Sequence, residues 1–267
     1  MILQKTLELL KSRYSTHMDK LFISDVVMGM HLTAVKLSDG SYGVASTLQD
    51  GVFHCARKNR DFGPFTPMQI TGQKVTDLFE TSKKSKITDT LKIAVLNAVS
   101  TKIIANGNYR VIENADPIDL LDLFQPQTIT IVGAFQSYIE KLSGSHHRLF
   151  ILELNKDALH EEHKKYYVPA SEYNNVIPNS DVLIITGLTL LNNTIDDLLS
   201  FVPENCRVVV TGPSGSIIPD VLFQHGVHMI GATRITKPVE LFNLVAQGGS
   251  GYHLFRYCAE KICIQNA

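Results

Sequence analysis

Residues 184–199, IITGLTLLNNTIDDLL, change from apolar to polar and then back to apolar. The stretch starts as a β-branched, apolar run and becomes rich in Thr, Gly and Asn before Thr194. After Thr194 the apolar residues return at helical spacing, in Ile195, Leu198 and Leu199. The pattern predicts a buried strand, a polar turn and a helix, which is the unit that layered α/β folds repeat.

Similar strand-like segments occur on both sides of this stretch. They are TITIVG, RLFILEL, DVLIITG, CRVVVTG and VHMIGA, all after residue 127. Apolar strands joined by helical crossovers predict a parallel sheet that is covered on both faces. Asp116 and Pro117 predict the start of a helix over residues 117–124, PIDLLDLF. Residues 237–262, KPVELFNLVAQGGSGYHLFRYCAEKI, predict two helices separated by QGGSG.

The beginning of the chain has a different pattern. Apolar residues at three- and four-residue steps between Leu3 and Leu21 predict an amphipathic helix. Asp39 and Gly40 lie between two alternating segments and predict a β-hairpin. Helical patterns follow around residues 75–79 and 87–99. We therefore predict an α/β protein with two domains: a small α+β domain over residues 1–110, and a Rossmann-like parallel-sheet domain over residues 111–267.

The composition excludes several classes of function. The chain has 267 residues and a formal charge of -1, from 25 basic and 26 acidic residues that are well mixed, so we expect no nucleic-acid partner. We find no run of about twenty apolar residues and no secretion signal at the start, and we therefore expect a cytosolic protein that does not contact membranes.

The cysteines and histidines do not form a recognisable metal motif. Four scattered cysteines, including Cys55, are expected to be reduced, and Cys206 is expected to be a small buried residue. His160 and His163 lie in HEEHKKYY, which lacks the HExxH order, so we interpret this pair as part of a solvated helix face.

The polar residues collect at the ends of the predicted parallel strands. Such strand ends share one edge of an open sheet, where ligands bind. Glu153 falls 20 residues after Gly133, the position of a ribose-binding carboxylate in dinucleotide folds. However, GAFQSY has one Gly where that fingerprint has three, so we do not expect a standard nicotinamide site. Two interpretations of Glu153 stay open. It binds a nucleoside-type ligand, or it is an ordinary strand-end carboxylate that pairs with a Lys or caps a helix.

Three other polar features each have two interpretations. GPSGS, residues 212–216, is typical of an anion-binding turn, or Ser214 or Ser216 caps the helix that follows. Thr194 and Asp197 suit a capping box, which would leave the other polar residues of that turn unexplained. Asn97, beside an apolar helix seam, either contributes to a site or forms hydrogen bonds across the domain interface.

These segments together resemble the putative heavy-metal chelation family, a domain of unknown function that follows an enolase-N-terminal-like domain. The resemblance rests on DVLIITGLTLLNNTIDDLL and VVVTGPSGSIIPDVLFQHGV, and it extends through ITIVGAF, LFILELN, TAVKLSDGSYGVAS and LNAV. It implies an enolase-N-terminal-like first domain, a Rossmann-like second domain and a shared cleft. The sequence departs from the family at Leu188, where a second Thr is more common, and at Gln136, where Pro is common.

The resemblance also implies a set of site residues. Matching positions give the ligand-binding candidates Asn97, Gly133, Glu153, Thr186, Gly187, Thr189, Asn192, Thr194, Gly212, Pro213 and Ser214. This set lacks the soft Cys and His ligands that bind zinc or copper.

Members of the family are associated with metal uptake and anaerobic cobalamin biosynthesis, and no reaction is established for them. We expect a protein that binds a small polar ligand or a metal chelate, with any cofactor, such as a metal ion, still unidentified. An enzyme that acts on an adenosyl-type or phosphorylated substrate is the alternative, although no nucleophile and base pair is evident. A structural role, in which protein fills the cleft, is a third interpretation. The sequence leaves open whether the chain forms a homodimer.

Overall fold

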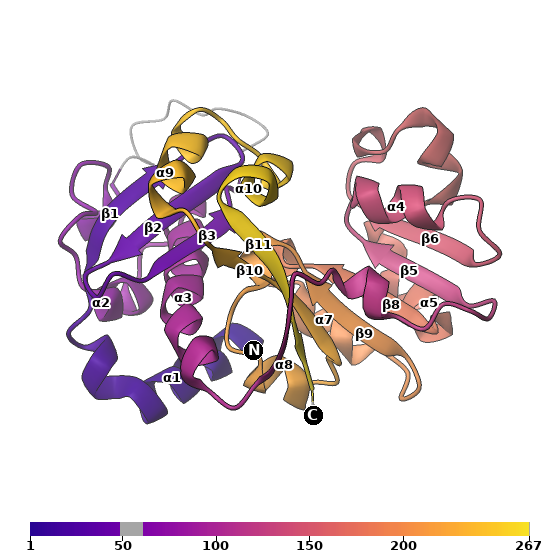
Figure 1. Ribbon diagram of the computed structural model, residues 1–267, viewed down its shortest axis with the longest axis horizontal. Coiled ribbons are helices and arrows are strands. Elements are labelled where there is room, and N and C mark those ends of the chain that lie inside the picture. Colours follow the sequence, from indigo (N-terminus) through magenta and orange to yellow (C-terminus); the bar gives the residue numbers. More distant parts are fainter. Residues whose placement is uncertain (49–60, 267) are drawn as a thin grey trace.

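The computed structural model describes residues 1–48 and 61–266 and contains two β-sheets that lie side by side (Figure 1). Cys55 lies outside the described residues. The elements of the first part are α1 (Ile2–Met18), β1 (Ile23–Met28), β2 (Leu32–Leu37), β3 (Tyr42–Ser46), α2 (Val75–Glu80) and α3 (Lys86–Asn106). In the described part of the chain, no helix is long and apolar enough to cross a membrane.

The first sheet is antiparallel, with strand order β1-β2-β3, and it contains the predicted hairpin. Gly40 has a φ of 81°, a conformation that a side chain disfavours, and Asp39 accepts a hydrogen bond from the backbone of Ser41. Helix α3 packs closely on β3, because a Cβ on Gly43 would lie 2.0 Å from the carbonyl oxygen of Ala94.

The second sheet has eight strands in the order β4-β11-β10-β9-β8-β5-β6-β7. Its strands are β4 (Arg110–Glu113), β5 (Thr128–Val132), β6 (Arg148–Glu153), β7 (Tyr167–Pro169), β8 (Val182–Thr186), β9 (Arg207–Thr211), β10 (Met229–Ile235) and β11 (Ala259–Gln265). Strands β5 to β10 are parallel, as predicted for the five segments quoted above, while β11 and β4 are antiparallel at one edge. The predicted fold class is confirmed; the boundary at residue 110 stays a prediction.

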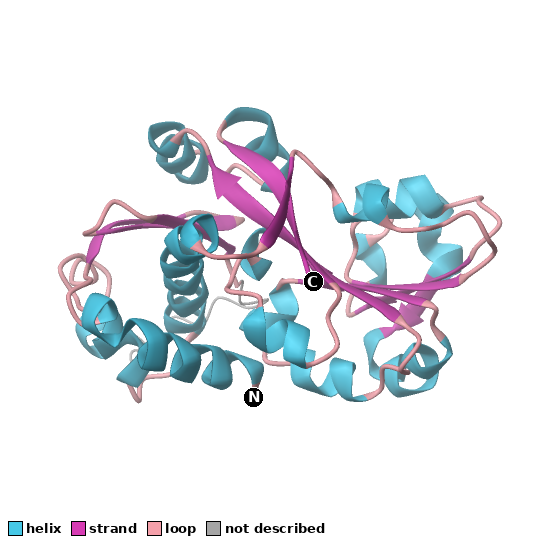
Figure 2. Ribbon diagram, turned by 60° about the horizontal axis from the view of Figure 1, so that its bottom comes forward, coloured by secondary structure: helices cyan, strands magenta, loops and turns pink. Residues whose placement is uncertain are grey.

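Helices cover both faces of this large sheet (Figure 2). They are α4 (Gln136–Leu142), α5 (Tyr173–Val176), α6 (Leu188–Leu191), α7 (Ile195–Ser200) and α8 (Asp220–Gln224). Two more helices, α9 (Pro238–Ala246) and α10 (Gly251–Tyr257), lie between β10 and β11 in the chain. Along β8, Val182 and Ile184 face the core under α4, whereas Leu183 and Ile185 face the core under α7 and α8. This alternation explains why the strand is apolar at every position.

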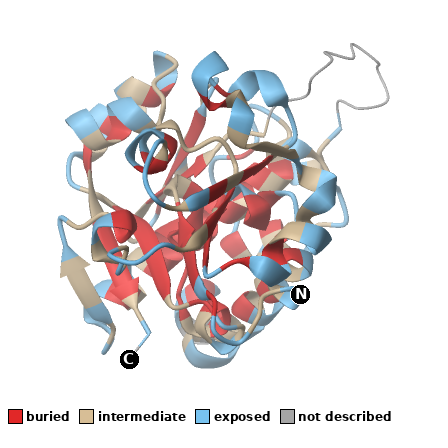
Figure 3. Ribbon diagram, turned by 90° about the vertical axis from the view of Figure 1, so that its right-hand side faces the viewer, coloured by how far each residue is buried: buried red, intermediate tan, exposed pale blue. Residues whose placement is uncertain are grey.

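The core under α7 and α8 continues into the first part of the chain. One buried cluster joins Leu10 of α1 and Ile93 of α3 to Val210 of β9. The buried residues therefore run through the centre of the molecule (Figure 3). Polar contacts support the junction: Arg13 lies 2.8 Å from Asp220.

Two predicted helices are shorter or end earlier than expected. Residues 117–124 form only a 3-10 turn, Pro117–Leu120, because the chain is extended again at Leu121 before it enters β5. The second helix predicted within residues 237–262 ends at Tyr257, and the chain then forms β11. That strand forms because Ile262, Cys263 and Ile264 are buried between β10 and β4.

The C-terminal helices α9 and α10 pack on the small sheet. Leu241 and Val245 of α9 and Leu254 of α10 form a third buried cluster with Ala34 of β2. A chain segment that follows the large sheet thus completes the core around the small one.

Candidate ligand-binding site

The carboxyl ends of β5, β6, β8 and β9 lie at one edge of the large sheet. Strand β5 has β6 on one side and β8 on the other, so the chain connections diverge between β5 and β8. Such a switch point leaves a crevice between neighbouring loops. A pocket of about 680 Å³ opens there, and Ser46 and Leu48 of the first part of the chain close one side of it.

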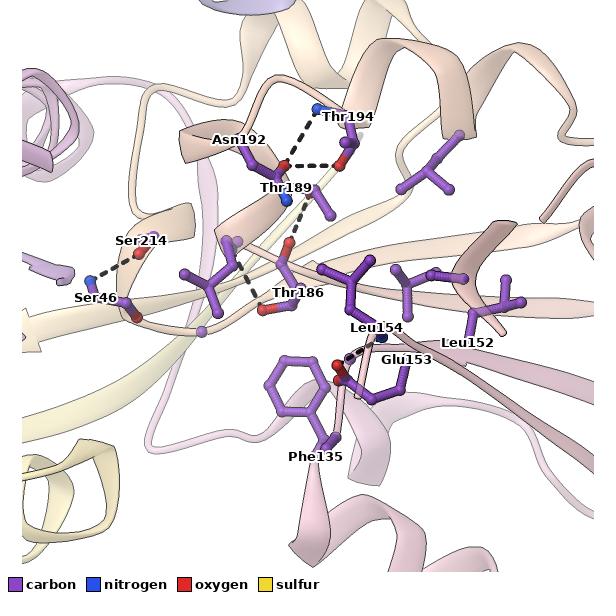
Figure 4. Close-up of a pocket in the computed structure, with 18 of the residues that line it drawn as sticks. Ser46, Phe135, Leu152, Glu153, Leu154, Thr186, Thr189, Asn192, Thr194 and Ser214 are labelled. Carbon is purple, nitrogen blue, oxygen red and sulfur yellow. Dashed lines mark hydrogen bonds between the residues drawn. The ribbon is translucent and has the colours of Figure 1, made fainter. Parts of the chain in front are cut away.

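The structure brings ten of the eleven candidate residues into the lining of this pocket. The ten are Gly133, Glu153, Thr186, Gly187, Thr189, Asn192, Thr194, Gly212, Pro213 and Ser214. Asn97 lies outside the lining. Figure 4 shows residues of the turns after β5, β6, β8 and β9 around the same space, with Thr186 between Asn192 and Glu153.

Hydrogen bonds within the turn after β8 explain why residues 186–194 are rich in Thr and Asn. The Thr189 hydroxyl donates to the Thr186 carbonyl at 2.7 Å, and the Thr186 hydroxyl accepts from the backbone of Leu188 at 3.3 Å. Asn192 accepts from the Thr194 hydroxyl at 2.7 Å and from its backbone N–H at 3.3 Å. The polar residues thus partner backbone and side-chain groups of the turn itself.

The predicted capping box of Thr194 and Asp197 is wrong. Thr194 precedes α7, but its hydroxyl donates to Asn192 and makes no capping hydrogen bond to the helix. Its backbone is already near-helical, with φ -93° and ψ -13°, whereas a capping residue needs an extended conformation. Asp197 instead lines the pocket.

Two glycines allow the turns after β8 and β9 to touch. A Cβ on Gly187 would lie 2.5 Å from the backbone nitrogen of Gly215, a contact that no side chain tolerates. Gly212 has a φ of 111°, which is unfavourable for any other residue. The glycines therefore shape the pocket floor through backbone geometry.

Long-range hydrogen bonds hold the turn after β9. The buried Ser214 hydroxyl accepts from the backbone N–H of Ser46 at 2.9 Å, and Ser216 accepts from that of Thr233 at 2.9 Å. The expectation that Ser214 or Ser216 caps the next helix is therefore wrong, because both hydroxyls accept from other strands. Helix α8 has no side-chain cap.

Asn97 acts across the junction between the two sheets. It is buried, and its amide donates to the Val44 carbonyl at 2.7 Å and to the Pro213 carbonyl at 3.0 Å. This is the second of the two interpretations that the sequence left open. Asn97 thus ties the turn after β9 to the small sheet, behind the pocket lining.

Glu153 ends β6 with its carboxylate turned back to the backbone. One oxygen accepts from the N–H of Leu154 at 2.7 Å and from that of Asn155 at 3.2 Å. Among residues 1–48 and 61–266, no Lys or Arg forms an ion pair with it. Neither of the two ordinary roles considered for it, a Lys partner or a helix cap, is present.

The pocket also has an apolar wall that sequence reasoning missed. Phe135, Leu152, Leu154 and Tyr173 line it, and Leu154 is 82% exposed (Figure 4). The sequence LEL at the end of β6 places an apolar residue on each side of Glu153, which was an available signal. The sequence does not show which strand ends face each other, so the wall itself could not be predicted. The wall makes the pocket suited to a ligand with an apolar body.

The lining does not fit a bare heavy-metal ion. The residues around the pocket include neither Cys nor His, and their oxygen donors are hard ligands. Cys206, Cys258 and Cys263 are free and buried elsewhere, and burial raises the pKa of the Cys206 thiol to about 12. Sulfur ligation in this pocket therefore has no support among the described residues.

The interpretation of the histidine pair as a solvated face is wrong in part. His160 is exposed, but His163 is only 4% exposed, in the 3-10 helix Glu161–Tyr166. This short helix lies against β6, which buries one of its faces.

The fold and the pocket define an α/β protein with a small antiparallel sheet, a large mostly parallel sheet and a pocket at the switch point. Two family models, both described as putative heavy-metal chelation, match residues 116–264 and residues 11–100. The chain belongs to this family, and the resemblance seen in the sequence is confirmed. No curated protein matches the chain.

Two solved structures share the fold over nearly the whole length. A protein of unknown function from Pyrococcus horikoshii has a TM-score of 0.77 at 20% identity, covering 99% of this chain and 98% of its own. A second protein of unknown function, from Desulfitobacterium hafniense, has a TM-score of 0.74 at 17% identity, covering 98% of this chain and 99% of its own. Both belong to the same family, and at this identity they show the fold alone.

Proposed function

We propose that the chain binds a small organic ligand, or a metal ion already held by such a ligand, in the pocket at the switch point. The observation that carries this proposal is the lining itself: an apolar wall of Phe135, Leu152 and Leu154 faces hydroxyl and amide groups across about 680 Å³. Pockets of this size and composition hold small molecules.

The donor set favours a chelate over a bare ion. A heavy metal that enters with its own ligands needs only contacts to those ligands, which hydroxyls, an amide and an apolar wall can supply. The family description supports a role in metal handling. The association with metal uptake and anaerobic cobalamin biosynthesis, which the resemblance implies, makes small metal complexes the first class to test.

The proposal is tested by identifying what copurifies with the native chain. Small molecules released from denatured protein are analysed by mass spectrometry, with metal content measured in parallel. Leu188 lines the pocket and is 37% exposed, so Leu188→Trp is expected to fill the space and remove the ligand without lowering Tm. Val239→Trp, at a 72% exposed position on α9, is the matched control. Equal ligand content in both variants contradicts the proposal.

An enzyme acting on an adenosyl-type or phosphorylated substrate is the second candidate. It is favoured by Glu153, which lines the pocket at the end of β6, beside the turn that contains Gly133. One oxygen of Glu153 accepts backbone hydrogen bonds, and the carboxylate could also accept from ribose hydroxyls. Calorimetry with adenosine and with inorganic phosphate tests this candidate, because Glu153→Gln should weaken only adenosine binding. The cytosolic location and the lack of a nucleic-acid partner stay predictions, and whether the chain forms a homodimer stays open.

A further inference from the structure

A second group of metal-ligand side chains lies outside the pocket. Strands β6 and β7 are joined by an excursion, residues 154–166, at the end of the molecule farthest from the small sheet (Figure 1). It carries His160, Glu162 and His163, and one ligand atom of each lies within 4.8 Å of the others. This is the one group of three such residues found in the described part of the chain.

His163 is the unusual member of the group. Its side chain is 4% exposed and its Nδ1 has no hydrogen-bond partner. Its Nε2 lies 3.8 Å from a carboxylate oxygen of Glu162, which is beyond hydrogen-bond distance. Buried polar groups are normally hydrogen-bonded, so the unpaired Nδ1 makes this ring an exception.

The other two members can move toward His163. His160 is exposed, and its ring lies nearly parallel to that of His163, with centroids 6.0 Å apart. The Glu162 side chain is 76% exposed. Metal bonds of about 2.0–2.2 Å need ligand atoms roughly 3–3.5 Å apart. Rotation of two exposed side chains supplies that approach while the buried ring stays fixed.

We propose that His160, Glu162 and His163 form a binding site for a divalent transition-metal ion of the zinc or nickel class. Two imidazoles and one carboxylate match the borderline character of these ions, and water completes the coordination shell. His163 is the anchor, because its ring is buried and the other two side chains are exposed.

The proposed metal site is independent of the pocket. None of its three residues lines the pocket, although Leu154, the first residue of the excursion, and Ala170, directly after β7, do. Loss of the metal site should therefore leave the small molecule of the pocket in place, and the two proposals fail independently.

The test is calorimetric titration of the metal-free, full-length chain with Zn²⁺ and with Ni²⁺. The wild-type chain should bind one equivalent, and His160→Ala and Glu162→Gln should each weaken binding at least tenfold. Both substituted positions are exposed, so their variants should fold normally. His163→Gln should abolish binding, with circular dichroism confirming that it folds.

His146→Ala is the matched control. His146 is also exposed, and its ring also lies beside that of a neighbouring histidine, His147, tilted by 47° with ring centroids 4.2 Å apart. This variant should bind metal within twofold of the wild type. The proposal is overturned if wild-type and His160→Ala chains bind Zn²⁺ and Ni²⁺ equally well, or if His146→Ala weakens binding as much as His160→Ala. Absorption bands of bound Co²⁺ that are lost in His160→Ala would further support nitrogen ligation at this site.

Discussion

The turns after β8 and β9 lie side by side at one edge of the sheet, yet different interactions hold them. In the turn after β8, Thr189 and Thr194 bond to residues two or three positions away. In the turn after β9, Ser214 bonds to Ser46, 168 positions away. A turn held by its own residues keeps its shape when distant parts move, whereas the other depends on the contact between the two sheets.

The largest effect is expected where the long-range contacts meet. Asn97→Ala removes the donor to the Val44 and Pro213 carbonyls inside the protein. Each buried group left unpaired costs about 1–3 kcal/mol, so the free energy of unfolding should fall by about 2–4 kcal/mol. Thermal melting should show a Tm lower by roughly 5–10 °C. The control is Asn175→Ala, whose amide donates to Glu172 on the surface; an equal loss in both variants would contradict a special role for Asn97.

A smaller loss is expected from the serine of the same turn. Ser214→Ala leaves the backbone N–H of Ser46 without its acceptor, at a cost of about 1–3 kcal/mol. Urea unfolding at neutral pH measures this change. The exposed Ser200, whose hydroxyl donates within its own helix, provides the control Ser200→Ala, which should change stability by less than about 0.5 kcal/mol. If Ser214→Ala is as stable as that control, this turn does not depend on the small sheet.

In the turn after β8, substitutions should reduce ligand affinity more than stability. Replacing Thr189 and Asn192 together by Ala should cost only about 0.5–1.5 kcal/mol, because their partners are local and part of the turn is exposed to water. Affinity for a pocket ligand should fall roughly five- to hundredfold for each hydrogen bond lost. Melting and retention of the copurified small molecule are measured on the same sample. A variant that melts many degrees lower but keeps its ligand would show that these residues serve the fold alone.

The hairpin turn of the small sheet combines both kinds of contact and should show the smallest effect. Burial alone would raise the pKa of Asp39, but hydrogen bonds from Lys102 and Ser41 outweigh it and lower the pKa to about 2. A lowered pKa means that the stabilisation is present at neutral pH and is lost as pH falls from about 4 toward 2. Because Lys102 is 45% exposed, solvent screening limits the gain to about 1 kcal/mol.

Asp39→Asn should therefore lower stability at pH 7 but have little effect near pH 2. Denaturant unfolding of the variant and the wild type at several pH values checks this sign. Asp61→Asn, at an exposed pair with Lys83, is the control and should show a weaker dependence on pH. A stability difference that grows as pH falls would contradict the assignment.

Much of the fold could be predicted because its signals lie between neighbouring residues. The apolar runs that became β5, β6, β8, β9 and β10, and the Asp39-Gly40 turn, are local patterns. Strand β11 was missed because its buried face depends on β10 and β4, which are distant in sequence. The length of the helix predicted over residues 117–124 also depends on distant contacts. Pro117 begins only a single 3-10 turn, because the chain soon enters β5.

The sequence likewise predicted one part of the candidate pocket and missed another. Strand ends rich in Gly, Thr and Asn could be assigned to one edge of the sheet from the sequence, since parallel strands place their carboxyl ends together. The apolar wall of Phe135 and Leu154 could not, because it forms only when the turns after β5 and β6 face each other. The burial of His163 against β6 was likewise invisible in the sequence HEEHKKYY.

The sequence by itself determined the five parallel strands quoted above, the hairpin turn, the family and the edge of the sheet where polar residues gather, because periodicity and turn chemistry are properties of residues close together in the chain. Only the tertiary structure decided that Ser214 partners Ser46, that Asn97 reaches Pro213 and that His163 loses its contact with water. Those outcomes depend on which surfaces pack together. A hydroxyl, an amide or an imidazole can take many partners, and its neighbours in space select one.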